Sequence, residues 1–221
     1  MENKQIIREI KVWDPLVRIF HWSLVLAFAT SYLSGDEWDD WGSVHEISGY
    51  IVLGLIVFRI IWGFVGSKYA RFSDFIYSPK VVFAYLKSLA TTHPKHYLGH
   101  NPAGGWMVIL LLASILATSI TGLKLLAVEH NEGPLAQVTI QLPSLIAEAE
   151  ARRKPGGDME EEGEEEGDEF WGEIHEFFAN FTLYLVLIHI AGVLVSSYLH
   201  KENLARAMVT GNKPIQDETD V

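Results

Sequence analysis

The sequence has 221 residues, a formal net charge of −11 and a mean hydropathy of +0.16. Hydrophobic residues make up 49% of it, and this composition points away from an ordinary water-soluble protein. The chain has no cysteine, which excludes disulfides, thiolate metal sites and cofactors attached through cysteine.

Four segments are long and apolar enough to cross a bilayer. A helix needs about 20 residues to span a hydrocarbon core of roughly 30 Å. The predicted spans are residues 16–34, 45–66, 102–124 and 175–199. They predict an all-α fold: an integral membrane four-helix bundle over residues 1–206, followed by a tail at 207–221.

Lysine and arginine are unevenly distributed among the predicted loops. The connection between the first two spans has none. Basic residues stand instead before the first span, between the second and third spans, and after the fourth: Lys4, Arg8, Lys11, Lys68, Arg71, Lys80, Lys87, Lys95, Lys201, Arg206 and Lys213. The positive-inside rule therefore predicts that both termini are cytoplasmic. Only Arg152, Arg153 and Lys154 in the third connection weaken this pattern.

The third connection, about residues 130–170, is predicted to be an acidic loop on the non-cytoplasmic side. At 158–169, nine of twelve residues are Asp or Glu, so most of the net charge is local. Such a run cannot bury itself, and we expect a solvated loop. A docking patch for a basic partner protein or a cation trap is the less favoured alternative. Just before it, residues 135–151 can form a short interfacial helix.

A second short helix is predicted at residues 78–90. Ser78 can cap it, Pro79 suits its first turn, and Val82, Tyr85 and Leu86 share one face. We expect this helix to pack on the bundle.

Helical geometry sorts four histidines into two pairs. His175 and His189 are fourteen residues apart, about four turns, so their rings leave one face of span four about 21 Å apart. His45 begins span two at the level of His175. His21 lies about 20 Å below the outer end of span one, level with His189. The predicted pairs are His45 with His175 and His21 with His189, each drawn from two helices.

Two imidazoles from opposing helices suit a metal held in a flat macrocycle, and imidazole binds iron well. We therefore predict two b-type haems with these histidines as axial ligands. Alternatively, a histidine in a span can simply hydrogen bond to a neighbouring helix. Zinc or copper at each pair is less favoured, because two imidazoles leave the coordination incomplete.

Small residues and arginines lie close to these histidines. Gly49 and Gly192 follow the histidines of spans two and four by one turn, which leaves room for a haem. Arg18 lies one turn before His21, and Arg59 lies near the depth of the same pair. Both arginines are candidate partners for haem carboxylates, since an unpaired arginine within a span is unfavourable. For Arg59, the alternative is a side chain that snorkels to the cytoplasmic surface.

Three more histidines, His93, His96 and His100, lie in the predicted loop before span three. There Asn101 can cap the helix and Pro102 can occupy its first turn. The spacing of the histidines could suit a metal, but we expect a solvated loop.

Several motifs together resemble the bacterial cytochrome b561 family, which is related to the cytochrome b subunits of nickel–iron hydrogenases. They are RIFHW at 18–22, HEISGY at 45–50, GHNPAGGWMV ending at Val108, and the segment 189–192. The resemblance implies a four-helix bundle in the bacterial inner membrane, with two b haems on His21, His45, His175 and His189. The chain departs from the family pattern in its long, acidic third connection.

The resemblance also implies electron transfer between the quinone pool and a redox partner such as a periplasmic c-type cytochrome. The alternative within this class is a membrane anchor of a hydrogenase or similar respiratory complex. An alternative from another class is a haem-free membrane scaffold or metal-binding permease component. No acid–base or nucleophilic site stands out, so enzymatic activity beyond quinone-linked oxidoreduction is not predicted. No nucleic-acid partner is expected, and a homodimer stays open.

Overall fold

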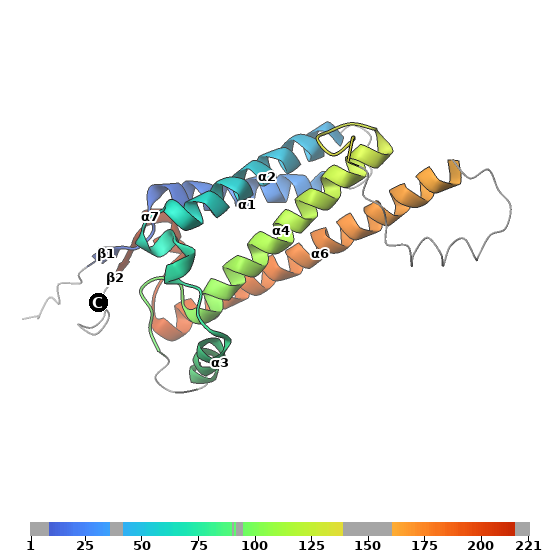
Figure 1. The fold of residues 1–221 in the computed structure, drawn as a ribbon. Helices are drawn as coiled ribbons and strands as arrows, with labels where there is room; N and C mark the ends of the chain where they lie inside the picture. The colour runs from blue at the N-terminus through green and yellow to red at the C-terminus, as the bar shows by residue number, and fades with distance from the viewer. Residues whose placement is uncertain (1–8, 36–41, 90, 92–94, 139–160, 215–221) are drawn as a thin grey trace, which may run out of the picture.

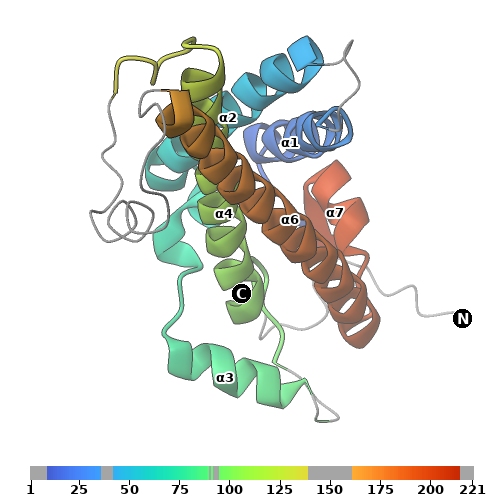
Figure 2. The same ribbon diagram turned by 90° about the vertical axis from the view of Figure 1, so that its right-hand side faces the viewer.

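The fold was analysed in a computed structural model, which describes residues 9–35, 42–89, 91, 95–138 and 161–214. Four long helices lie side by side in it: α1 (Pro15–Leu33), α2 (Gly42–Val65), α4 (Pro102–Glu129) and α6 (Glu161–His200) (Figure 1). α1 packs on α2 and α4 packs on α6, and contacts between α2 and α4 join the two pairs (Figure 2). The predicted four-helix bundle is confirmed, and the described residues also form a small two-stranded sheet that the all-α prediction did not include.

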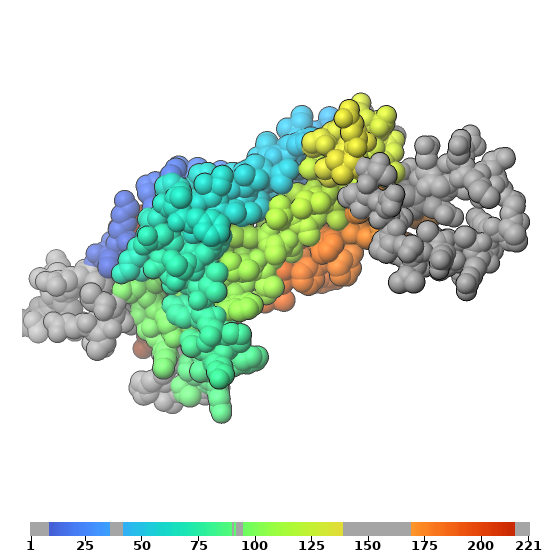
Figure 3. Space-filling model, in the orientation of Figure 1, coloured from blue at the N-terminus to red at the C-terminus, as the bar shows by residue number. Residues whose placement is uncertain are grey.

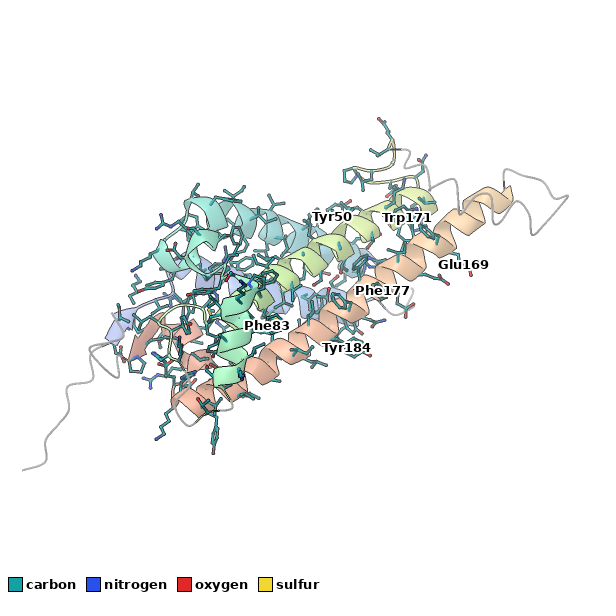
Figure 4. The ribbon with its side chains drawn as sticks, turned by 60° about the horizontal axis from the view of Figure 1, so that its bottom comes forward. Tyr50, Phe83, Glu169, Trp171, Phe177 and Tyr184 are labelled. Carbon is teal, nitrogen blue, oxygen red and sulfur yellow. The ribbon has the colours of Figure 1, made fainter. Side chains whose placement is uncertain are left out.

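Each of the four helices is long and apolar enough to cross a membrane, over Pro15–Leu33, Gly42–Val65, Pro102–Glu129 and Glu169–His200. Large apolar side chains cover their outer surfaces, among them Leu26, Leu194, Phe177 and Tyr184, each at least 63% exposed. The last two are labelled in Figure 4. So much exposed apolar surface is normal for a bundle surrounded by lipid.

The sequence sets where two of the spanning helices begin. An Asp14 carboxylate oxygen accepts a hydrogen bond from the Val17 amide at 2.9 Å, and the next residue is a proline. In the same way, Asn101 Oδ1 accepts from the Gly104 amide at 2.7 Å, ahead of Pro102. Each cap satisfies an amide that the first turn leaves without a partner. The predicted start of span three is therefore confirmed.

Both ends of the described chain meet at one end of the bundle, here called the terminal end. Strand β1 (Glu9–Lys11) pairs antiparallel with β2 (Asn212–Pro214), next to helix α7 (Leu204–Thr210). Short helices η1 (Lys68–Ala70) and η2 (Phe72–Asp74) lie there too. The predicted tail boundary at 206 falls inside α7, and residues 207–214 pack against the N-terminal segment. Residues 215–221 lie outside the described residues.

Helix α3 (Pro79–Ser88) also lies at the terminal end and projects from the bundle in the space-filling view (Figure 3). Tyr85 of this helix is buried and the helix packs mainly against α4, whereas Phe83 is 72% exposed. This confirms the predicted helix and its packing on the bundle. The Ser78 side chain does not cap it.

Two apolar clusters hold the described structure together. Val12, Trp13, Val17, Ala70 and Ala207 pack at the terminal end. Phe20, Val52, Ile56, Leu112 and Ile115 pack between α1, α2 and α4. Between α4 and α6, the Thr118 and fully buried Thr182 hydroxyls lie 3.3 Å apart and share a hydrogen bond. A polar contact of this kind is a normal link between helices in a membrane.

The third connection is shorter than predicted. Span three was expected to end at Lys124, but α4 continues to Glu129, because Lys124 Nζ donates to the Val138 carbonyl at 2.9 Å and need not reach solvent. Span four was expected to begin at 175, but α6 begins at Glu161, within the stretch expected to be a solvated loop. Glutamate is a good helix former and is favourable near a helix N-terminus. Most of the predicted interfacial helix at 135–151 lies outside the described residues.

Candidate functional site

One pair of histidines lies at the end of the bundle opposite the terminal end. The ring centres of His45, from α2, and His175, from α6, are 6.0 Å apart, with the planes at 85°. His45 Nδ1 lies 2.9 Å from the Ser31 carbonyl, and His175 Nδ1 lies 3.0 Å from the Thr118 carbonyl. A carbonyl oxygen only accepts, so each Nδ1 carries the proton and donates. Each Nε2 is then left with a lone pair that can bind a metal.

The second pair lies nearer the terminal end. The ring centres of His21, from α1, and His189, from α6, are 6.5 Å apart, with the planes at 54°. His21 Nδ1 is buried and has no hydrogen-bond partner. The structure therefore brings together the two pairs that the sequence predicted. Because α6 is continuous from His175 to His189, the pairs are separated by about 21 Å along its axis.

The spacing within each pair suits one metal ion between the rings. Two metal–imidazole bonds of about 2 Å each, plus about 1 Å from each bonding nitrogen to its ring centre, separate two ring centres by roughly 6 Å. Both pairs match this distance. Within the described ranges, no group of three or more His, Asp or Glu side chains could hold an ion. A porphyrin brings four nitrogen ligands of its own, so the two imidazoles of one pair are all that it needs from the protein.

A cavity adjoins the His45/His175 pair. It has about 760 Å³ of empty space, a volume that includes the open solvent at its mouth. Gly49 lines it, and a Cβ there would meet no atom within 4 Å. A Cβ on Gly192, beside the other pair, would also meet nothing. Both glycines leave the open space that a flat macrocycle needs.

Gly122 contributes to the site in a way that the sequence did not reveal. It lines the same cavity, and a Cβ on it would lie 2.8 Å from His175 Cε1. The His175 ring can occupy its position only because residue 122 has no side chain. The sequence carried no signal for the histidine that approaches this glycine.

Arg18 and Arg59, the candidate partners for haem carboxylates, lie at the terminal end, and each has a buried nitrogen without a hydrogen-bond partner. Arg59 is only 3% exposed; its guanidinium lies over the rings of Phe72 and Phe75, at 5.2 and 5.8 Å from their centres. Its Nη1 is buried without a partner. Arg18 Nη1 donates to the Val209 carbonyl at 2.5 Å, while Arg18 Nε is buried and unpaired. Because Arg59 is buried in protein, the snorkelling alternative is wrong.

The loop before α4 is not solvated as expected. His96 Nε2 bonds to the Glu202 carboxylate, which also pairs with Lys213 at 3.3 Å and is 2% exposed. Burial would raise the pKa of Glu202, but the His96 hydrogen bond and the Lys213 charge outweigh it and lower that pKa. The loop therefore folds in and ties the end of α6 to β2. His93 lies outside the described residues.

His100 also packs inward from this loop. Its ring centre lies 4.6 Å from that of Trp13 and 4.5 Å from that of Phe75. Burial, followed by the charges of Arg59, Lys213 and His189, lowers the pKa of His100 to about 3. The ring is therefore neutral at physiological pH. The solvated position expected from the sequence is wrong, because aromatic residues far away in the chain cover it.

The chain is similar to known proteins over most of its length. A family model described as prokaryotic cytochrome b561 matches residues 12–211. The chain is 27% identical over 154 residues to a probable Ni/Fe-hydrogenase B-type cytochrome subunit from Azotobacter chroococcum mcd 1, covering 58% of this chain and 63% of that relative. A protein of the same description from Rhizobium leguminosarum bv. viciae is 25% identical over 159 residues, covering 59% and 64%.

A third relative with this description, from Azotobacter vinelandii, is 27% identical over 145 residues, covering 53% of this chain and 60% of the relative. The chain thus spans less than two thirds of the length of these curated relatives. No solved structure matches the chain.

Proposed function

Because the chain belongs to the prokaryotic cytochrome b561 family, we propose that it performs the electron transfer of a membrane cytochrome b with two b haems. The family and the four apolar helices make it a multi-pass membrane cytochrome. In our proposal, one haem is held by His45 and His175 and the other by His21 and His189. The observation that carries this proposal is the matching spacing of the two ring pairs, 6.0 and 6.5 Å.

Each residue would have a defined task. The Ser31 and Thr118 carbonyls hold the protons on Nδ1 of His45 and His175, which fixes the tautomer and leaves each Nε2 with a lone pair for a metal. Arg18 and Arg59 would pair with haem carboxylates at the terminal end, while Gly49 and Gly192 keep space for the macrocycles. When bound, the haem iron supplies one-electron oxidation and reduction.

The two sites would connect different depths of the membrane. They are separated by about 21 Å along α6, and the terminal end lies nearer His21 and His189. We place the protein in the bacterial inner membrane with both termini cytoplasmic, as the loop charges favour. Electrons would then pass between a quinone on one side of this path and a redox partner, such as a periplasmic c-type cytochrome, on the other.

A membrane anchor of a hydrogenase is the second candidate. It is favoured by the relatives, which are described as B-type cytochrome subunits of Ni/Fe-hydrogenases. Affinity purification from native membranes separates the two candidates. Recovery with stoichiometric hydrogenase subunits would support the anchor, whereas recovery of the cytochrome alone in fully haem-loaded form would support the independent carrier.

Haem counting tests the proposal directly. The purified wild-type protein should contain two haems per chain and show a b-type α band on reduction. His189→Ala should lose one haem and keep the one on His45 and His175, while His130→Ala, at a 61% exposed side chain, should keep both. A wild-type protein with no haem would rule out the function. Two haems in His189→Ala would rule out the assigned pairing.

A further inference from the structure

Buried nitrogens without a partner gather at the terminal end. In the part of the chain that the structure describes, each buried side-chain nitrogen that lacks a hydrogen-bond partner lies in that half of the bundle: Arg18 Nε, His21 Nδ1, Arg59 Nη1 and His100 Nδ1. At the other end, by contrast, Nδ1 of both histidines is paired with a backbone carbonyl. A buried polar group without a partner is unfavourable, so this grouping calls for a ligand rich in acceptor oxygens.

Arg59 defines the charge of that ligand. It is a permanent cation with 3% exposure, and burying such a charge without a counter-ion is strongly unfavourable. Asp14 is an acid whose charge acts on it. However, the oxygens of Asp14 already accept hydrogen bonds from Val17, Trp62 and Ser67. Arg59 Nη1 itself has no hydrogen-bond partner, so it can pair with a second anion.

His100 approaches the same place from a different element. Its ring packs on Phe75, as the Arg59 guanidinium does. Arg59 is also the strongest charged influence on His100, ahead of Lys213 and His189, so the three groups share one electrostatic neighbourhood. As a neutral imidazole, His100 has one N–H to donate. Arg59 and His100 thus offer two donors from α2 and from the loop before α4.

The depth of Arg59 matches that of the second histidine pair. It lies six residues, about 9 Å, before the end of α2 at Val65. His21 lies six residues, again about 9 Å, after the start of α1 at Pro15, and α1 packs on α2. A carboxylate carried at the edge of a macrocycle between His21 and His189 is therefore an anion at the right level.

We propose that Arg59 and His100 together bind one carboxylate of the haem held by His21 and His189, with the guanidinium supplying the charge and the imidazole an oriented hydrogen bond. This inference rests on the proposed function, and it assigns a role to His100 that the sequence did not predict. The loop 95–101 then closes this haem site, because His100 is fixed by the ligand on one side and by Trp13 on the other.

Infrared difference spectroscopy on the intact protein tests this assignment. Growth on carboxyl-labelled 5-aminolaevulinate places carbon-13 in the haem carboxylates, whose bands then appear in the reduced-minus-oxidised spectrum. The variants are Arg59→Gln, His100→Leu and His100→Gln, the last of which keeps a donor. The controls are Arg71→Gln, at an exposed arginine paired with Asp74, and His130→Leu, at the opposite end.

The labelled carboxylate bands should shift in Arg59→Gln and in His100→Leu, shift less in His100→Gln, and stay in place in both controls. Arg59→Gln should also lower the midpoint potential of the haem on His21 and His189, because loss of a nearby cation favours the oxidised form. The other haem should keep its potential. Retention of that other haem shows that a variant is folded; if Arg59→Gln loses it, the His100 variants decide the outcome.

Unmoved bands in folded Arg59→Gln and His100→Leu, with both haems retained, would overturn the inference and leave the two-haem function intact. Loss of binding of an added ubiquinone analogue without any band shift would overturn it too, since the donors would then serve a quinone carbonyl. A wild-type protein that contains no haem would instead refute the proposed function itself.

Discussion

A methyl group at position 122 should displace His175, one of the four proposed haem ligands, and leave the other three in place. In Gly122→Ala, the new Cβ would lie 2.8 Å from Cε1 and 3.1 Å from Nδ1 of His175. Carbon atoms in good contact lie about 3.5–4.0 Å apart, so the ring must move by roughly 0.7 Å or more. That movement also strains the 3.0 Å hydrogen bond from Nδ1 to the Thr118 carbonyl, which orients the ring.

The size of the effect follows from overpacking. Inserting a methyl group into a packed site costs about 1–3 kcal/mol. If the whole of this cost weakens haem binding at His45 and His175, the affinity for that haem falls by about 5- to 150-fold, at roughly 1.4 kcal/mol for each factor of ten. The haem on His21 and His189 should be unaffected, because it is about 21 Å away along α6.

The measurement is the rate at which each haem is lost to an excess of a haem-scavenging protein, followed by the α band. Gly54→Ala is the matched control, because residue 54 is an exposed helical glycine whose Cβ would meet no atom within 4 Å. Equal loss rates in Gly122→Ala and in the control would refute the reasoning. So would loss of the haem on His21 and His189 alone.

Three further substitutions test a hydrogen bond, a close contact and a buried carboxylate. Thr182→Val removes the hydroxyl paired with Thr118 while keeping the shape, so the free energy of unfolding in mixed detergent should fall by about 0.6 kcal/mol; an unchanged value would mean that this bond contributes nothing. Gly105→Ala places a Cβ on the Phe75 carbonyl oxygen, which cannot rotate away, so unfolding titrations should show a loss of about 1–3 kcal/mol, and none if α4 simply shifts. The pKa of Glu202 is lowered in the folded state, so its contribution to stability is present above its ordinary pKa and is lost as the pH falls through the lowered value. In thermal melts, the midpoint temperature Tm should therefore fall less steeply between pH 7 and pH 3 for Glu202→Gln than for the wild type. Parallel curves of Tm against pH would contradict this.

Helix positions were readable from the sequence because the signals are local. Apolar runs of about 20 residues, Asn101 and Pro102 specify the spans without knowledge of the rest of the fold. The errors occurred where charged residues stand at a helix end. Lys124 was taken as the end of span three, but the distant Val138 carbonyl accepts its hydrogen bond. The acidic run was taken as loop, but helix α6 already includes Glu161.

The histidine pairs were also predictable, because a regular rise of 1.5 Å per residue converts sequence number into depth. His21 and His189 could therefore be matched without coordinates, as could His45 and His175. The carbonyls that orient two of these rings could not be predicted, since every residue has a backbone carbonyl and nothing in the residue type marks Ser31 or Thr118. Whether both pairs bind haem, and on which side the termini lie, stay predictions.

By itself, the sequence determined four spanning helices, two depths for histidines and an excess of acid in one connection, because periodicity, length and charge are properties of a single segment. Only the tertiary structure decided that Gly122 gives His175 its space and that Arg59 and His100, from separate elements, come together at the Phe75 ring. These arrangements bring together residues 41 or more positions apart, and their energies depend on distances between elements that no local pattern encodes.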